Sequence, residues 1–305
     1  MSALRAAVTV RVPAKVNVQL AVGAARPDGF HDLANVFLAV SLFDEVTATP
    51  ADTLTVTCEG PDADKVPLDR TNLAARAAEI LAARSGIEPA VHLHIAKSIP
   101  VAGGMAGGSA DGAAALLACD ALWGLDTPRA ELLGLCAELG SDVPFSLVGG
   151  AALGTGRGEL LTPVEAGAFH WVFAVADGGL STPAVFREFD RLAEAEGTRI
   201  PVPVASPVLL AALASGDANA LGAALANDLQ AAALSLRPPL ARTLAAGVEG
   251  GALAALVSGS GPTTAFLVAD EESAAKVAAA LEASGTCRAT HVASSPAPGA
   301  TVLPS

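Results

Sequence analysis

A glycine-rich segment between a predicted strand and an alanine-rich predicted helix is the clearest chemical signal in this sequence. Exposed backbone N–H groups and the positive end of a helix dipole favour an anion, so the segment predicts a phosphate-binding loop. A Walker A loop is excluded, because Ser109-Ala110 stand where Lys-Ser/Thr is required. The alternative is a flexible turn that binds nothing. The segment comprises Pro100, Val101, Ala102, Gly103, Gly104, Met105, Ala106, Gly107, Gly108, Ser109 and Ala110.

A lysine, an asparagine and an aspartate form a second set of candidates. Lys15 and Asn17 stand two residues apart in an alternating apolar segment, so their side chains leave the same face of a strand and could contact one ligand. Asp142 lies in a short polar turn between Gly140 and Val143-Pro144. The alternatives are a solvated charge for Lys15 and a plain helix cap for Asp142.

The turn from Arg26 to His31 presents an aromatic ring beside an imidazole, at Phe30 and His31. It is also compatible with an ordinary Pro-Asp-Gly turn. A second glycine turn, from Ser258 to Thr264, could bind an anion or merely reverse the chain. His92 and His94 share a strand face but lack a third ligand, which favours a solvated face over a metal site.

The spacing of apolar residues predicts the elements that position these groups: alternation at every second residue predicts strands, and recurrence every three to four residues predicts helices. Strands are expected near 6–12, 15–22, 35–49, 53–58, 91–95, 171–176, 263–269 and 287–293. Helices are expected over 73–84, 109–122, from Thr127-Pro128 to Gly140, and over 183–195, 207–233 and 272–284. This pattern indicates an α+β protein. The Pro/Ser/Gly-rich tail after Ser294 is expected to be loosely held.

Composition excludes several classes of function. The 305 residues include 18 basic and 31 acidic side chains, a formal charge of -13, which argues against nucleic acid or an anionic membrane as partner. The longest uncharged stretch, 250–269, is interrupted by the second glycine turn, and no secretory leader pattern occurs at the N-terminus. We therefore expect a cytoplasmic protein. The four cysteines lack metal or redox spacing and predict buried reduced thiols, with no disulfide or structural metal.

Taken in order, these motifs resemble the GHMP kinase superfamily. The resemblance runs from about residue 10 to 268 and rests on Pro13-Ala14-Lys15-Val16-Asn17, Arg26 to Leu33, the glycine loop, Gly140 to Pro144 and Gly259 to Pro262. The resemblance implies two α+β domains, an N-terminal ATP-binding domain over 1–160, similar to the ribosomal protein S5 domain 2 fold, and a C-terminal domain over 161–305. The active site would lie in the cleft between them.

The pairing of P-A-K-x-N with R-x-D-G-[YF]-H resembles members that transfer the γ-phosphoryl of ATP, with Mg²⁺, to a hydroxyl of a small cytidyl substrate. By that resemblance Asp142 is the base, Lys15 its charged partner, and residues 100–110 bind the ATP phosphates. The further implied roles are adenosine binding by Asn72 and Lys97, cytosine binding by His31, stacking by Phe30 and Phe186, and substrate contacts by Asn17 and Thr182.

The sequence departs from the family pattern at three places. Phe30 replaces a common tyrosine and keeps the stacking face. Ala102 and Ala106 replace glycines, which predicts that backbone angles open only to glycine are not needed there. Ala110-Asp111 replaces a Ser-Asn pair and puts a carboxylate of undefined role near the nucleotide. Two rival functions stay open: a GHMP kinase of homoserine or mevalonate type, and a catalytically silent nucleotide sensor.

Overall fold

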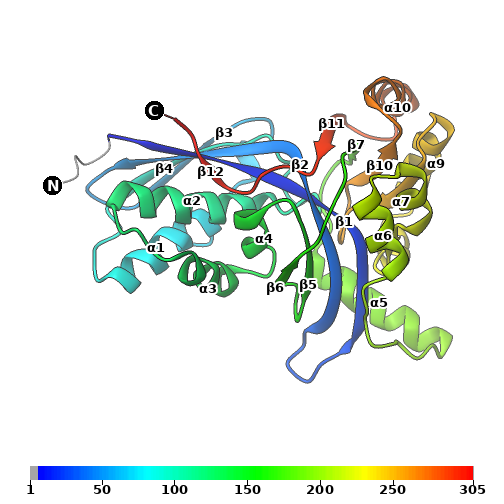
Figure 1. Cartoon of the computed structure of the whole chain (residues 1–305), viewed down its shortest axis with the longest axis horizontal. Helices are drawn as coiled ribbons and strands as arrows, with labels where there is room; N and C mark the ends of the chain where they lie inside the picture. The colour runs from blue at the N-terminus through cyan, green and yellow to red at the C-terminus, as the bar shows by residue number, and fades with distance from the viewer. Residues whose placement is uncertain (1–5, 305) are drawn as a thin grey trace.

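A long two-stranded hairpin organises the protein, whose computed structural model describes residues 6–304 (Figure 1). β1 (Val8–Ala25) and β2 (His31–Pro50) pair in antiparallel register along almost their whole length. The predicted strands at 6–12 and 15–22 are one strand, because a register shift at Pro13/Ala14 absorbs the proline without ending the pairing. The hairpin therefore crosses the molecule and carries residues far apart in space on one rigid element.

The first sheet has eight strands built around this hairpin. Its main path is β12 (Thr301–Val302), β1, β2, β4 (Val91–Ala96) and β3 (Thr55–Glu59). β5 (Ala151–Thr155) pairs with β2 and with β6 (Leu160–Pro163), and β8 (Ala226–Asn227) runs parallel to β1. A short 3₁₀ helix, η1 (Ala63–Lys65), follows β3.

Four helices cover one face of this sheet (Figure 1): α1 (Leu73–Ser85), α2 (Gly107–Trp123), α3 (Arg129–Leu139) and α4 (Val143–Val148). α2 packs directly on β1 and β2, and α3 packs on the other three helices. α1 starts where predicted, since Asn72 accepts a hydrogen bond from the Ala74 N–H, and it ends at left-handed Gly86. α2 is buried on almost every side, which its small alanine side chains permit by letting neighbouring elements approach closely. The helices predicted over 73–84, 109–122 and up to Gly140 are confirmed.

The second sheet is antiparallel, in the order β11 (Ala289–Ser295), β7 (Phe169–Val175), β10 (Thr264–Val268) and β9 (Ala254–Val257). α9 (Leu240–Glu249) and α10 (Glu271–Ser284) belong to the apolar cluster that includes Val172 and Phe266 on one face of this sheet. Trp171 and Leu267 face the other way, into the cluster that contains α6 (Pro207–Ser215) and α7 (Ala218–Ala224). A further apolar cluster joins α5 (Thr182–Glu196) and α8 (Gln230–Leu236) to Leu20 and Val22, near the tip of the hairpin.

The prediction of one helix over 207–233 is wrong. Gly216 is left-handed and ends α6, and the Asp217 side chain then accepts hydrogen bonds from two backbone N–H groups to start α7. The short strand β8 and the helix α8 follow. The alanine- and leucine-rich composition favoured one long helix although Ser215-Gly216-Asp217 and Asn227-Asp228 mark the breaks. The sequence pattern also did not predict α9 and β9.

The prediction of a loosely held tail is also wrong. Trp171 donates its ring N–H to the Ser295 hydroxyl at 3.0 Å, Ala297 is buried, and β12 pairs with β1. The Pro/Ser/Gly composition was misleading because backbone groups of this segment are paired with the rest of the fold: the Ala297 N–H donates to the Ala39 carbonyl at 2.9 Å and the Ala300 N–H to the Ser146 carbonyl at 3.0 Å. Of the four cysteines, Cys119 and Cys136 are buried free thiols, whereas Cys58 and Cys287 are partly exposed.

The division at residue 160 stays a prediction. The second sheet comes wholly from residues after it, whereas β6 begins at Leu160 and β8 and β12 return to the first sheet.

The close approach of α9 to the second sheet gives a stability test. A Cβ added at Gly247 would lie 2.1 Å from the Phe266 ring, so Gly247→Ala should lower the free energy of unfolding by about 1–3 kcal/mol through overpacking. Gly134 in α3 has open space around it, and Gly134→Ala should raise the same quantity by about 0.5–1 kcal/mol. Urea unfolding of both variants measures this. Equal effects of the two changes would contradict the packing argument.

Candidate active site

Lys15 and Asp142 face each other at the centre of the candidate site. The Lys15 Nζ lies 3.6 Å from Oδ2 of Asp142, and the lysine side chain is 6% exposed against 31% for the aspartate. Asp142 occupies the N-cap position of α4 but its side chain makes no capping hydrogen bond within the described part of the chain. The helix-cap alternative for Asp142 therefore does not account for this side chain, whose carboxylate stays accessible.

A network of hydrogen bonds holds the Lys15 ammonium in place. Nζ donates to Oδ1 of Asn17 at 2.7 Å and to the Gly104 carbonyl at 3.0 Å. Asn17 in turn donates to Oδ1 of Asn35 on the paired strand at 2.7 Å, which orients its amide oxygen toward the lysine. Burial lowers the pKa of Lys15, and the nearby Asp142 carboxylate opposes that shift. The prediction that Lys15 and Asn17 share one strand face is confirmed.

The two glycine turns interlock beside Lys15. Gly104 has a positive φ of 78°, and a Cβ there would lie 2.1 Å from the Ser258 carbonyl oxygen. The Ser258 hydroxyl donates to the Gly104 carbonyl at 3.0 Å, and the Thr263 N–H donates to the Gly103 carbonyl at 3.2 Å. Segments 150 residues apart thus form one structure, which the sequence pattern did not reveal.

Ala102 and Ala106 adopt backbone angles that are open to residues other than glycine but strained for them. Both adopt positive φ, 54° and 61°, in the region that side chains disfavour. Ala106 is the N-cap residue of α2, and its side chain makes no capping hydrogen bond. The first N–H groups of a helix have no intrahelical partner, so those of α2 can bind a ligand. The loop therefore stores backbone strain at two non-glycine positions.

Asn72 and Lys97 lie on the α1 side of this loop, but their polar groups are already engaged. Asn72 caps α1 and donates to the Pro67 carbonyl at 2.7 Å. The Lys97 ammonium is sandwiched between the carboxylates of Asp44 and Asp111, and a Cβ added to Gly107 would lie 2.9 Å from it. Sequence reasoning missed Asp44, although a carboxylate inside an apolar strand was an available signal.

His31 lies near the tip of the β1–β2 hairpin, away from the glycine loop, and packs against α5. Its Nε2 is 3.0 and 3.2 Å from the two Asp190 carboxylate oxygens, and its ring centroid is 4.9 Å from that of Phe186. Phe30 is 48% exposed and lies under the Arg157 guanidinium, 5.0 Å from ring centroid to Cζ. Asp190 and Arg157 come from segments for which the sequence showed no motif, and only the tertiary structure brings them here.

Thr182, at the start of α5, connects that helix to the second glycine turn. Its hydroxyl is 2.9 Å from the Ser260 hydroxyl. Phe186 follows Thr182 by one helical turn, so both side chains share a face of α5. The structure thus gathers Lys15, Asn17, Asp142, Thr182 and the glycine turns, with His31 and Phe186 further along the hairpin.

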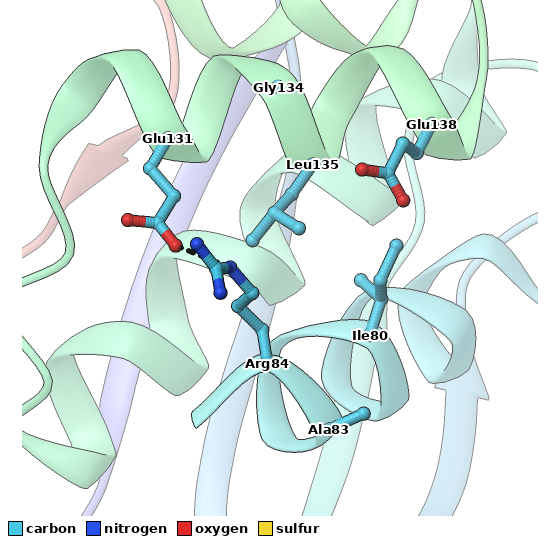
Figure 2. Close-up of a pocket in the computed structure, with 7 residues that line it drawn as sticks. All are labelled: Ile80, Ala83, Arg84, Glu131, Gly134, Leu135 and Glu138. Atoms are coloured by element: carbon cyan, nitrogen blue, oxygen red, sulfur yellow. Dashed lines mark ion pairs between the residues drawn. The ribbon is translucent and has the colours of Figure 1, made fainter. Parts of the chain in front are cut away.

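A hollow elsewhere contains none of the predicted site residues. It lies between α1 and α3, has a volume of about 380 Å³ and is bordered by the Arg84–Glu131 ion pair over Ile80 and Leu135 (Figure 2). Across residues 6–304, no helix is long and apolar enough to cross a membrane.

Two family models match separate segments of the chain. Residues 72–150 match the GHMP kinases N terminal domain, and residues 209–287 match the GHMP kinases C terminal domain. A homoserine kinase structure from Cytophaga hutchinsonii has the same fold, with a TM-score of 0.75 at 19% identity over 99% of both chains. Fold and domains together define a small-molecule kinase that uses ATP.

Relatives with higher sequence identity show which family of small-molecule kinases the chain belongs to. The chain is 76% identical to a 4-diphosphocytidyl-2-C-methyl-D-erythritol kinase of Streptomyces avermitilis, over 97% of this chain and 99% of that protein. It is 57% identical to one from Mycobacterium bovis, over 97% and 93%. A crystal structure of 4-(cytidine 5'-diphospho)-2C-methyl-D-erythritol kinase has a TM-score of 0.77 at 30% identity, covering 94% of this chain and 99% of that chain. The chain belongs to the 4-diphosphocytidyl-2-C-methyl-D-erythritol kinase family within the GHMP kinases.

The strained loop predicts that a glycine at position 106 is more stable than the alanine. Ala106→Gly should raise the free energy of unfolding by up to about 1 kcal/mol, because glycine adopts positive φ without the clash that costs alanine roughly 1–2 kcal/mol. Ala83→Gly, on the exposed side of α1, should lower it by about 0.5–1 kcal/mol. Chemical unfolding compares them. A similar loss in both variants would show that Ala106 is unstrained.

Proposed function

We propose that this chain transfers the γ-phosphoryl group of ATP to the 2-hydroxyl of 4-diphosphocytidyl-2-C-methyl-D-erythritol, giving the 2-phosphate and ADP in the non-mevalonate route to isoprenoid precursors. The observation that carries the proposal is the Lys15–Asp142 pair, 3.6 Å apart, beside two interlocked glycine turns. Its relatives at 55–76% identity bear the name of that kinase. Measuring ADP release with this substrate beside homoserine and mevalonate tests the substrate assignment.

Asp142 is the proposed base. The substrate hydroxyl oxygen attacks the γ-phosphorus, the bond from that phosphorus to the β–γ bridging oxygen breaks, and the hydroxyl proton passes to the Asp142 carboxylate. Lys15 stands beside the same carboxylate and would stabilise the charge on the transferring group. Because the transition state is loose, positioning contributes much of the effect, and the Asn17–Asn35 amide pair supplies it for Lys15.

The glycine loop is the proposed site of the ATP phosphates. The first N–H groups of α2 have no intrahelical partner, and Gly108 is exposed at the start of the helix, where a phosphate could approach the backbone. Asn72 and Lys97 would border the adenosine through their positions, since their own polar groups are engaged. Residues 6–304 contain no group of three or more His, Cys, Asp or Glu side chains that could hold a metal ion. Mg²⁺ commonly binds through substrate phosphates and water, and we propose that it enters with ATP.

His31, Phe30 and Phe186 are the proposed cytosine contacts. A neutral His31 that donates Nε2–H to Asp190 keeps Nδ1 as an acceptor, which matches the amino group of cytosine. Phe186 already contacts the His31 ring, and the exposed face of Phe30 offers a second stacking surface. Asn17 and Thr182 would complete the contacts to the rest of the substrate.

Removing the base tests the mechanism. Asp142→Asn should lower kcat by about 10²- to 10⁴-fold and leave ATP affinity unchanged, because the amide cannot accept the proton. Lys15→Ala should lower kcat at least as far. Glu138→Gln, in the hollow of Figure 2, is the control and should leave kcat alone. An unchanged kcat for Asp142→Asn would refute the assignment.

Removing the Phe30 ring tests the cytosine site. Base–aromatic stacking is worth roughly 1–3 kcal/mol, so Phe30→Ala should raise KM for the cytidyl substrate by about 5- to 150-fold and spare KM for ATP. Phe30→Tyr keeps the ring and should be nearly silent. If Phe30 only packs under Arg157, Phe30→Ala would instead lower Tm with no change in the ratio of the two KM values. Steady-state kinetics and thermal unfolding separate these results.

A further inference from the structure

A buried cluster of three charged side chains lies directly beneath the glycine loop. Asp44 comes from β2, Lys97 from the segment after β4, and Asp111 from the second turn of α2. Their side chains are 0%, 2% and 4% exposed. Two carboxylates therefore share one ammonium group out of contact with water, and the cluster has one negative charge in excess if both carboxylates are ionised.

The two carboxylates are not equivalent. Oδ1 of Asp44 accepts the backbone N–H groups of Ser98 and Ile99 at 2.6 and 2.8 Å, while its Oδ2 accepts from Lys97. Asp111 accepts from Lys97 through Oδ2 at 2.7 Å, and its buried Oδ1 has no hydrogen-bond partner among residues 6–304. Hydrogen bonds to a carboxylate favour its ionised form, so the excess charge is best removed by a proton on Asp111.

The charge on Asp111 lies close to the proposed phosphate site. Asp111 follows Gly107 by four residues on one face of α2, a rise of about 6 Å. The Lys97 ammonium that pairs with Asp111 is 2.9 Å from the position of a Gly107 Cβ. An ionised Asp111 would therefore offset the Lys97 charge and the helix dipole that attract an anion at this end of α2.

We propose that the Asp44–Lys97–Asp111 cluster is a proton-linked part of the nucleotide site, in which nucleotide phosphates bind more tightly when Asp111 is protonated, so that binding takes up a proton. The inference rests on the proposed placement of the ATP phosphates at the N-terminus of α2. It gives Asp111, a carboxylate to which the sequence assigned no role, a positioning role that acts through charge.

The surroundings of Asp111 set the pH at which this link operates. Burial raises its pKa, the Lys97 ammonium lowers it and the Asp44 carboxylate raises it, which leaves the value at about 7. Cys58 faces the cluster from β3, and burial together with the neighbouring carboxylates raises the pKa of its thiol, so it stays neutral. A protonated Asp111 is the abundant form below pH 7 and the ionised form above it, so nucleotide affinity should fall as pH rises.

Calorimetric titration of the whole protein with Mg²⁺-ADP, in two buffers of different ionisation enthalpy, measures the proton directly. If Asp111 is coupled to the phosphates by about tenfold, proton uptake should be about 0.4 per ADP at pH 8 and below about 0.1 at pH 6. KM for ATP should rise about fivefold between these pH values for the same reason. Uptake near zero at pH 8 in the unmodified protein would overturn the proposal without any variant.

Two matched variants assign the proton to its residue. Asp111→Asn mimics the protonated carboxyl and should abolish uptake and flatten the pH dependence of KM. Asp120→Asn removes a buried carboxylate of the same helix, one that accepts a hydrogen bond from the Thr127 N–H. This control variant should keep both the proton uptake and the pH dependence of KM. Uptake retained in Asp111→Asn would refute the assignment. ADP binding is measured without the second substrate, so the result does not depend on whether the cytidyl substrate is assigned correctly. If the protein phosphorylates the cytidyl substrate but takes up no proton on binding ADP, only the present inference is overturned.

Discussion

The Gly104 carbonyl is the point at which the site is assembled. It accepts hydrogen bonds from the Lys15 ammonium at 3.0 Å and from the Ser258 hydroxyl at 3.0 Å, so the first sheet, the glycine loop and the second glycine turn meet at one oxygen. A buried ammonium needs such partners, since leaving it unpaired would cost several kcal/mol. Lys15 therefore shapes the loop that it is proposed to work beside.

Two lysines bracket the glycine loop, in a chain that has four in total. Lys15 contacts the loop at Gly104, and Lys97 lies under Gly107 at the start of α2. Each is paired with carboxylates, Lys15 with Asp142 and Lys97 with Asp44 and Asp111. In a protein of net charge -13, this local arrangement is what an anionic nucleotide would encounter on approaching the loop.

The long β1–β2 hairpin explains how distant parts of the site keep their spacing. It carries Asp44, which pairs with Lys97, toward its open end, Lys15 in the middle and His31 near its tip. Its two strands are paired almost throughout, so these side chains are fixed relative to one another by backbone hydrogen bonds. The packing of α5 on the hairpin then adds Phe186 and Asp190 to the tip.

Local signals were sufficient for much of this protein. Strand alternation, the Asn72 cap, Gly86 and the glycine loop depend on residues near in sequence, and the motif order identified the family. Contacts between distant segments were not encoded locally: Ser258 on Gly104, Asp190 on His31, and Asp44 with Asp111 around Lys97. Nor could composition show that Ala102 and Ala106 adopt positive φ, because packing around the loop supplies the energy that holds them there. The sequence by itself indicated the family and the candidate groups for the chemistry, whereas tertiary packing decided the partners of those groups and their charge, since desolvation depends on the whole fold.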